Sequence, residues 1–71
     1  MYKEIFHAKI KAARKQALFT QKEVEQETGI QQSILSRIEN GIQEPSIEVL
    51  GILIDLYGVN ADWILGTGKN K

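Results

Sequence analysis

Apolar residues recur along the chain at spacings of three and four, which is the period of an α-helix. In the first segment they fall on one face of a helix from about Tyr2 to Leu18: Ile5, Phe6, Ile10, Ala13 and Ala17. No run of β-branched residues alternates for long enough to indicate a strand. The pattern therefore predicts an all-α protein.

A capping box at Thr20 and Glu23 opens the second predicted helix, because each residue can bond the backbone amide of the other. This helix runs to about Glu27 and stops at Gly29, which supplies a left-handed exit. A third helix is predicted over residues 31–39. Two short helices joined by a three-residue turn with a glycine have the sequence form of a helix-turn-helix.

Two more helices complete the predicted domain. Ser46 is a good N-cap for a fourth helix that extends to about Tyr57, and Asn60 caps a short fifth helix. We expect residues 1–66 to form one compact five-helix domain and residues 67–71 to form a flexible tail.

Composition narrows the classes of function. The chain has 71 residues, no cysteine, one histidine and nine residues of each charge sign. A disulfide scaffold and a multi-histidine metal site are therefore excluded, and no catalytic or cofactor-binding pattern is present. Because catalytic patterns are missing, we expect a non-enzymatic protein. The first ten residues lack the apolar core of a signal peptide, and no apolar stretch is long enough to span a membrane, so we expect a cytoplasmic protein without a membrane partner.

The residues around the turn resemble the Cro/repressor-type helix-turn-helix family, the lambda-repressor-like (XRE) regulators of phages and bacteria. The matching motifs are Phe19-Thr20-Gln21, Val24, Thr28-Gly29-Ile30, Gln32-Ser33, Arg37-Ile38-Glu39-Asn40-Gly41, Pro45-Ser46 and the segment 57–66. The resemblance covers roughly residues 10–66. It implies a five-helix DNA-binding fold whose second and third helices form the helix-turn-helix.

The resemblance implies that the third helix reads bases in the major groove. Gln32 is expected to bond a base edge, often adenine, and to be braced by Gln21. Ser33, Ser36 and Arg37 share the outward face, and Arg37 can bond a guanine or a phosphate. Gln31 is either a plain solvated residue or part of base reading, and it is a poor N-cap.

Phosphate contacts are expected at two places beside this helix. Gln21 and Lys22 lie in the first turn of the second helix, where free backbone amides can hold a phosphate. Asn40 and Gly41 match the phosphate clamp of the family, and they also suit a helix C-cap. The loop 42–44 has no cation, which together with zero net charge predicts a shallow dependence of binding on salt.

Arg14 and Glu39 match an ion pair that the family places between the first helix and the end of the recognition helix, the alternative being two independent surface charges. Glu25 departs from the family pattern, which usually has a small residue there. His7 is expected to be exposed. The three lysines of this helix are expected to form a solvated face rather than to grip a phosphate: Lys9, Lys11 and Lys15.

The fourth helix is apolar nearly all round. One stripe suffices for the core: Ile47, Leu50, Leu53, Ile54 and Tyr57. The remaining apolar residues, with Trp63, either form a slightly apolar surface or meet a second copy of the chain: Val49, Ile52 and Leu56. We expect the second, a homodimer.

The leading hypothesis is a sequence-specific transcriptional regulator, most simply a repressor that binds a palindromic operator in double-stranded DNA as a dimer. A second hypothesis is the antitoxin of a toxin–antitoxin pair, which would bind DNA and a protein toxin. A third is an interaction domain that has lost DNA binding. The third hypothesis is disfavoured, because the chain keeps the DNA-facing residues Gln21, Gln32 and Arg37.

Overall fold

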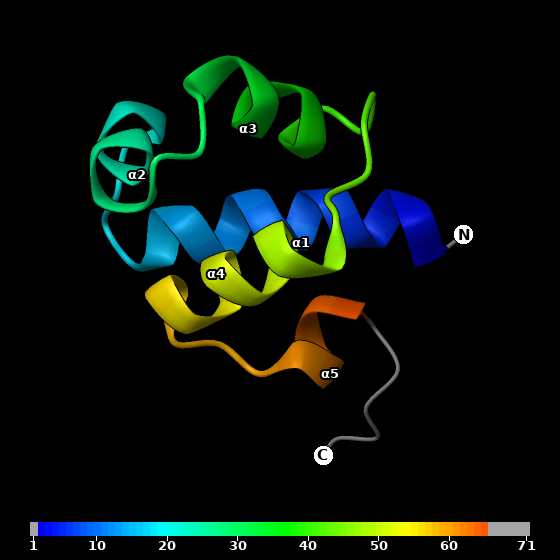
Figure 1. Cartoon of the computed structure of the whole chain (residues 1–71). Coiled ribbons are helices and arrows are strands. Elements are labelled where there is room, and N and C mark those ends of the chain that lie inside the picture. The colour runs from blue at the N-terminus through cyan, green and yellow to red at the C-terminus, as the bar shows by residue number, and fades with distance from the viewer. Residues whose placement is uncertain (1, 66–71) are drawn as a thin grey trace.

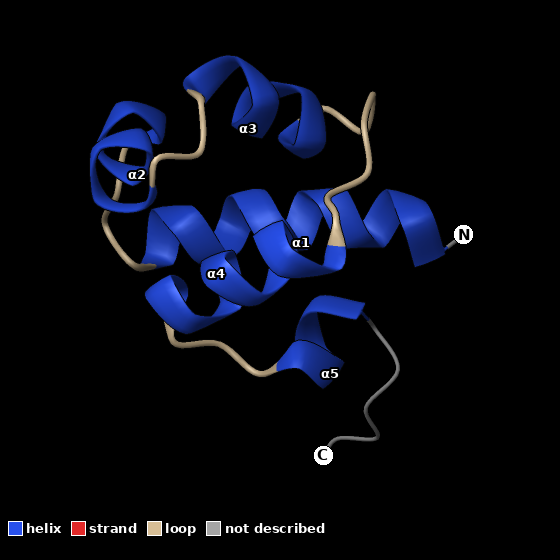
Figure 2. Cartoon of the chain, viewed as in Figure 1, coloured by secondary structure: helices blue, strands red, loops and turns tan. Residues whose placement is uncertain are grey.

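The computed structural model describes residues 2–65, with the side chains of residues 6–64, and this part is built from helices and their connections (Figures 1 and 2). The helices are α1 (Tyr2–Gln16), α2 (Gln21–Thr28), α3 (Gln32–Glu39), α4 (Ile47–Tyr57) and α5 (Ala61–Leu65). The predicted all-α, five-helix fold is confirmed. The predicted tail 67–71 lies outside the described residues. No described helix is long and apolar enough to cross a bilayer.

Helix α1 is the element against which the rest of the domain packs. Figure 1 shows α2 and α3 on one side of it and α5 on the opposite side, with α4 alongside. Residues of α1 contact α3, α4 and α5, while α2 contacts α3. The helix-turn-helix and the C-terminal helices therefore share one support.

The core contains one or more residues from each of the five helices. Its most completely buried side chains are Ile10, Ala13, Val24, Leu35, Ile38, Leu53 and Ile64. Burying an aliphatic side chain of this size stabilises a fold by about 1.5–3 kcal/mol relative to leaving it in water. Contributions from every helix make the core a single unit rather than separate clusters.

Helix boundaries follow the local signals with small shifts. Helix α1 ends at Gln16, two residues before the predicted end, because Leu18 adopts a left-handed conformation with φ of 66°. Helix α3 begins at Gln32, and Gln31 takes the N-cap position without a side-chain cap bond. Ser46 caps α4 by accepting from the amide of Val49 at 3.1 Å, as the sequence predicted.

One core prediction is wrong. Ile47 is 90% exposed, although its spacing places it on the apolar stripe of α4. Leu53 and Tyr57, on the same stripe, are buried. The spacing identifies a side of the helix, but burial also requires another element opposite that turn, and no described element covers Ile47 in the first turn of α4.

Candidate DNA-binding surface

The corner between α2 and α3 is fixed by bonds within the turn itself. Gly29 has φ of 81°, and its amide donates to Glu25 O at 2.8 Å. The Thr28 hydroxyl donates to Val24 O at 2.7 Å and accepts from the amide of Ile30 at 3.1 Å. A left-handed residue is least strained when it is glycine. The angle between the two helices therefore follows largely from residues 28–30.

Both reciprocal hydrogen bonds of the capping box are present at the start of α2. Thr20 Oγ1 accepts from the Glu23 amide at 3.1 Å, and Glu23 Oε1 accepts from the Thr20 amide at 2.8 Å. The amides of Gln21 and Lys22 lie in the first helical turn, where no preceding carbonyl of the helix can accept from them. This helix end therefore offers donors and the positive end of a dipole to an anion.

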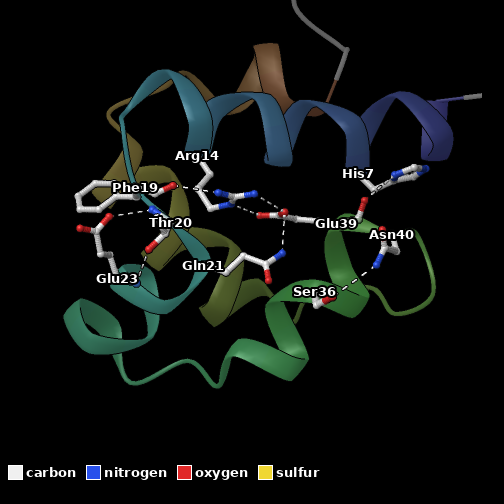
Figure 3. Close-up of polar contacts among 9 residues, drawn as sticks. All are labelled: His7, Arg14, Phe19, Thr20, Gln21, Glu23, Ser36, Glu39 and Asn40. Carbon is white, nitrogen blue, oxygen red and sulfur yellow. Dashed lines mark hydrogen bonds and ion pairs between the residues drawn. The ribbon is translucent and has the colours of Figure 1, made fainter.

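The structure brings Arg14 of α1 and Glu39 of α3 together in a two-pronged ion pair (Figure 3). Arg14 Nε donates to Glu39 Oε2 at 2.7 Å, and Nη2 donates to Oε1 at 3.0 Å. Arg14 Nη1 donates to Phe19 O at 2.9 Å. The hydrogen bonds to Glu39 raise the pKa of Arg14 further, against the effect of burial. Both side chains are buried, so the pair ties the end of α3 to α1.

Gln21 joins this pair from α2. Its Nε2 donates to Glu39 Oε1 at 3.1 Å. Because an ionised carboxylate only accepts, the amide must present its nitrogen here. In the structure, Gln21 braces the ion pair, whereas the sequence analysis predicted that it braces Gln32. Three helices meet at the Glu39 carboxylate.

The nine residues predicted to face DNA lie at the start of α2, along α3 and just beyond it. Gln21 and Ser36 are half-buried. The others are exposed: Lys22, Gln31, Gln32, Ser33, Arg37, Asn40 and Gly41. Leu35 and Ile38 occupy the opposite face of α3 and are buried in the core. Helix α3 thus presents a polar face while its apolar face holds it to the domain.

The segment after α3 turns back onto the helix. Gly41 has φ of 75°, and the amides of Ile42 and Gln43 both donate to Arg37 O, at 2.9 and 3.3 Å. Arg37 Nε donates to Gln43 Oε1 at 3.0 Å, so one exposed side chain orients the other. Asn40 Nδ2 donates to Ser36 Oγ at 3.4 Å. These bonds orient Arg37, Ser36 and Asn40, which are predicted to contact DNA.

Comparison with known proteins agrees with this geometry. The helix-turn-helix family model matches residues 10–64, which reach from α1 to α5. The chain belongs to the Cro/repressor-type helix-turn-helix family. Members of this family are DNA-binding transcription regulators, so the resemblance seen in the sequence is confirmed.

One relative shows how far the likeness extends. The chain is 36% identical over 58 residues to the HTH-type transcriptional regulator ImmR of Bacillus subtilis (strain 168). The match covers 82% of this chain and 46% of that protein, so the chain spans about half the length of its curated relative. No solved structure matches the chain. Neither family nor relative points to a toxin–antitoxin pair.

This helix-turn-helix domain uses two side chains that the sequence analysis misjudged. His7, predicted to be exposed, is half-buried, and its Nδ1 lies 3.0 Å from Glu39 O. Lys9, predicted to be solvated, donates from Nζ to Trp63 O at 3.0 Å and lies 5.1 Å from the centre of the Trp63 ring. Both contacts join α1 to elements far along the chain, and no local sequence signal indicates them.

Behind the ion pair lies a buried tyrosine. The Tyr57 hydroxyl has no hydrogen-bond partner among the described residues. Burial raises the pKa of Tyr57 to about 12, and the negative charge of Glu39 contributes in the same direction. The Phe19 and Tyr57 ring centroids are 6.4 Å apart. Tyr57 therefore serves packing, and burial of its hydroxyl is unfavourable.

The four residues predicted to form a dimer interface differ in exposure. Val49 and Leu56 are half-buried against the core. Ile52 and Trp63 are each 38% exposed. One part of Trp63 is already occupied by the Lys9 ammonium. Of the four residues, Ile52 and Trp63 therefore keep the most exposed apolar surface.

Proposed function

We propose that this domain recognises a specific DNA sequence with α3 in the major groove, and that it represses transcription by occupying a palindromic operator as a dimer. The observation that carries the proposal is the construction of α3. Its outer face bears exposed Gln32, Ser33 and Arg37, while Glu39 at its end is held by Arg14 and Gln21. A reading helix held rigidly loses less conformational freedom on binding.

The chemistry of the outer face suits base recognition. A glutamine amide bonds the N6 and N7 edge of adenine with two hydrogen bonds, and an arginine does the same with guanine. Ser33 and Arg37 lie four residues apart on one exposed face of α3, and exposed Gln32 borders Ser33. We therefore expect Gln32 and Arg37 to meet different base pairs of the same groove. Phosphates on either side are held by the first turn of α2, by Lys22, and by Asn40 with Gly41.

The proposed binding by two copies matches the spacing of successive major grooves on one face of DNA. The recognition helices of a helix-turn-helix dimer enter successive grooves about 34–36 Å apart on one face of the duplex. We place the contact between copies at Ile52 and Trp63, the exposed apolar side chains of α4 and α5. A two-fold axis there would make the operator palindromic.

Selection of bound sequences from a pool of random duplexes tests sequence recognition. We expect a palindromic consensus. Gln32→Ala should then cost about 1–3 kcal/mol on the selected duplex and flatten the preference at one position in each half-site. Lys22→Ala is the matched control, because loss of a phosphate contact weakens all duplexes equally and lowers the salt slope by about 1 per subunit. An unchanged ratio of selected to scrambled binding in Gln32→Ala would refute the assignment of α3.

Sedimentation on and off the duplex tests the dimer. Ile52→Glu should bind the palindromic duplex as one copy where the parent binds as two. Ile47→Glu adds the same charge at a more exposed apolar position outside the proposed contact, so it should leave the stoichiometry unchanged. A parent that saturates the palindrome with a single copy would refute the dimer.

A further inference from the structure

His7 places a titratable side chain against the end of the recognition helix. It is the chain's one histidine, and its Nδ1 lies 3.0 Å from the backbone oxygen of Glu39. Because a carbonyl oxygen only accepts, Nδ1 carries a hydrogen in both charge states of the ring. The proton that an imidazole gains or loses near neutral pH is therefore carried by Nε2.

The Nε2 edge of the ring lies against Gly41. A Cβ built on Gly41 would lie 2.9 Å from His7 Cδ2, which is closer than real Cβ atoms come, and 3.0 Å from Nε2. Gly41 and the preceding Asn40 are exposed, and Figure 3 shows His7 beside Asn40 and the end of α3. The bond from Nδ1 fixes the ring so that its titrating nitrogen borders the exposed segment 40–41.

We propose that His7 is a further DNA-contacting residue, whose imidazolium form donates from Nε2 to the same phosphate that Asn40 and Gly41 hold. This inference rests on the proposed function, which assigns segment 40–41 to a phosphate. The protonated ring offers a donor and a positive charge, and charge-assisted bonds to phosphate are strong. The neutral ring turns a lone pair of Nε2 toward the phosphate oxygens. Binding of DNA therefore takes up a proton, and affinity rises as the pH falls.

The other charged groups around His7 do not account for a pH-dependent contact with the phosphate. From α3, the carboxylate of Glu39 is engaged by Arg14 and Gln21, and Arg37 is bonded to Gln43. The loop after α3 contributes Glu44, which already takes part in another interaction. Helix α1 contributes Lys11, which is exposed one turn beyond His7. Side chains of these other types do not ordinarily titrate near neutral pH.

The shortage of cations on this surface gives one added charge a measurable effect. The loop 42–44 has no lysine or arginine, and the chain has no net charge at neutral pH. One additional charged bond to phosphate should strengthen binding about fivefold to tenfold for each domain bound. It should also steepen the dependence of log K on log salt by about 0.9 per domain. A purely structural role for His7 would not steepen the salt dependence.

The experiment measures fluorescence anisotropy of a labelled duplex from the selection, and of its scrambled counterpart, between about pH 5.5 and pH 8 at several salt concentrations. The proteins are the parent, His7→Asn and Lys11→Gln. Asparagine can still donate to Glu39 O but has no proton to gain, so it separates positioning from charge. Lys11→Gln removes a charge from the same helix and should keep the parent's pH profile. Circular dichroism at each pH verifies that every variant is folded.

We expect the parent to bind both duplexes more tightly at the acidic end, by about fivefold to tenfold for each domain bound, with a steeper salt slope there. His7→Asn should bind as the neutral parent does at every pH. A flat parent profile, or a pH profile retained in His7→Asn, would overturn the role of His7. With the parent still preferring the selected duplex, that result would leave the proposed function intact. A parent that binds no duplex would overturn both.

Discussion

Replacing Glu39 by glutamine tests the junction that holds the recognition helix. Glu39 is 3% exposed, and its carboxylate accepts three hydrogen bonds, two from Arg14 and one from Gln21. Glutamine has the same shape, but it offers one oxygen and turns an NH2 group toward donors. The substitution therefore leaves the Arg14 guanidinium buried without its counter-charge.

The expected cost is large for a domain of this size. Removing one partner of a buried ion pair costs about 3–5 kcal/mol, because the remaining charge stays desolvated. At about 0.05–0.15 kcal/mol per residue, 71 residues give a total stability of about 4–11 kcal/mol. Glu39→Gln should therefore remove roughly half of the stability of the domain.

Urea unfolding followed by circular dichroism measures this loss. Glu27→Gln is the matched control, because Glu27 is an exposed carboxylate of α2 and its loss should change the free energy of unfolding by less than about 0.5 kcal/mol. Replacing both partners, in Arg14→Met with Glu39→Leu, strands no charge and should be more stable than Glu39→Gln alone.

Two results would refute the reasoning. Equal free energies of unfolding for Glu39→Gln and Glu27→Gln would mean that the ion pair is open to water in solution. A double variant no more stable than Glu39→Gln would mean that the cost comes from lost packing rather than from a stranded charge.

Three further substitutions test other parts of the structure. Tyr57 should make stability fall between pH 10 and 12, by about 2–3 kcal/mol, because the folded protein holds the phenol proton more tightly than the unfolded chain. Unfolding of Tyr57→Phe at neutral and alkaline pH should show no such fall, and no loss at neutral pH because the hydroxyl has no described partner. Leu18→Gly should raise the melting temperature, because glycine removes the strain of a left-handed residue and should increase the free energy of unfolding by about 0.5–1 kcal/mol. Leu18→Ala keeps a side chain at φ of 66° and should not raise the melting temperature. Lys9→Ala should shift Trp63 fluorescence and cost about 0.5–2 kcal/mol, whereas Lys11→Ala, an exposed lysine of the same helix, should do neither.

The helices and their order could be predicted from the amino-acid sequence alone. Several boundaries depend on groups within about four residues of one another: the Thr20 and Glu23 capping box, the left-handed Gly29 and Gly58, and the Ser46 cap. Short-range bonds of this kind are encoded in adjacent letters, so they can be inferred without knowing the fold. The same holds for the outward face of α3, which follows from its helical period.

Pairings across the fold needed either the family resemblance or the structure. The spacing of Arg14 and Glu39 does not indicate a contact, and only the resemblance suggested it. The bond of His7 to Glu39 spans 32 positions and that of Lys9 to Trp63 spans 54. Such contacts depend on where α1 lies against α3 and α5, which no residue fixes alone.

Packing between helices also set the surroundings of side chains that the pattern had placed correctly on a helix. Ile47 lies on the apolar stripe of α4 and is still exposed, and Tyr57 lies on that stripe with a hydroxyl that finds no described partner. Gln21 turns toward Glu39 because α1, α2 and α3 converge there. A helical period gives the direction of a side chain, whereas its neighbours are set by the packing of the whole core, to which all helices contribute together.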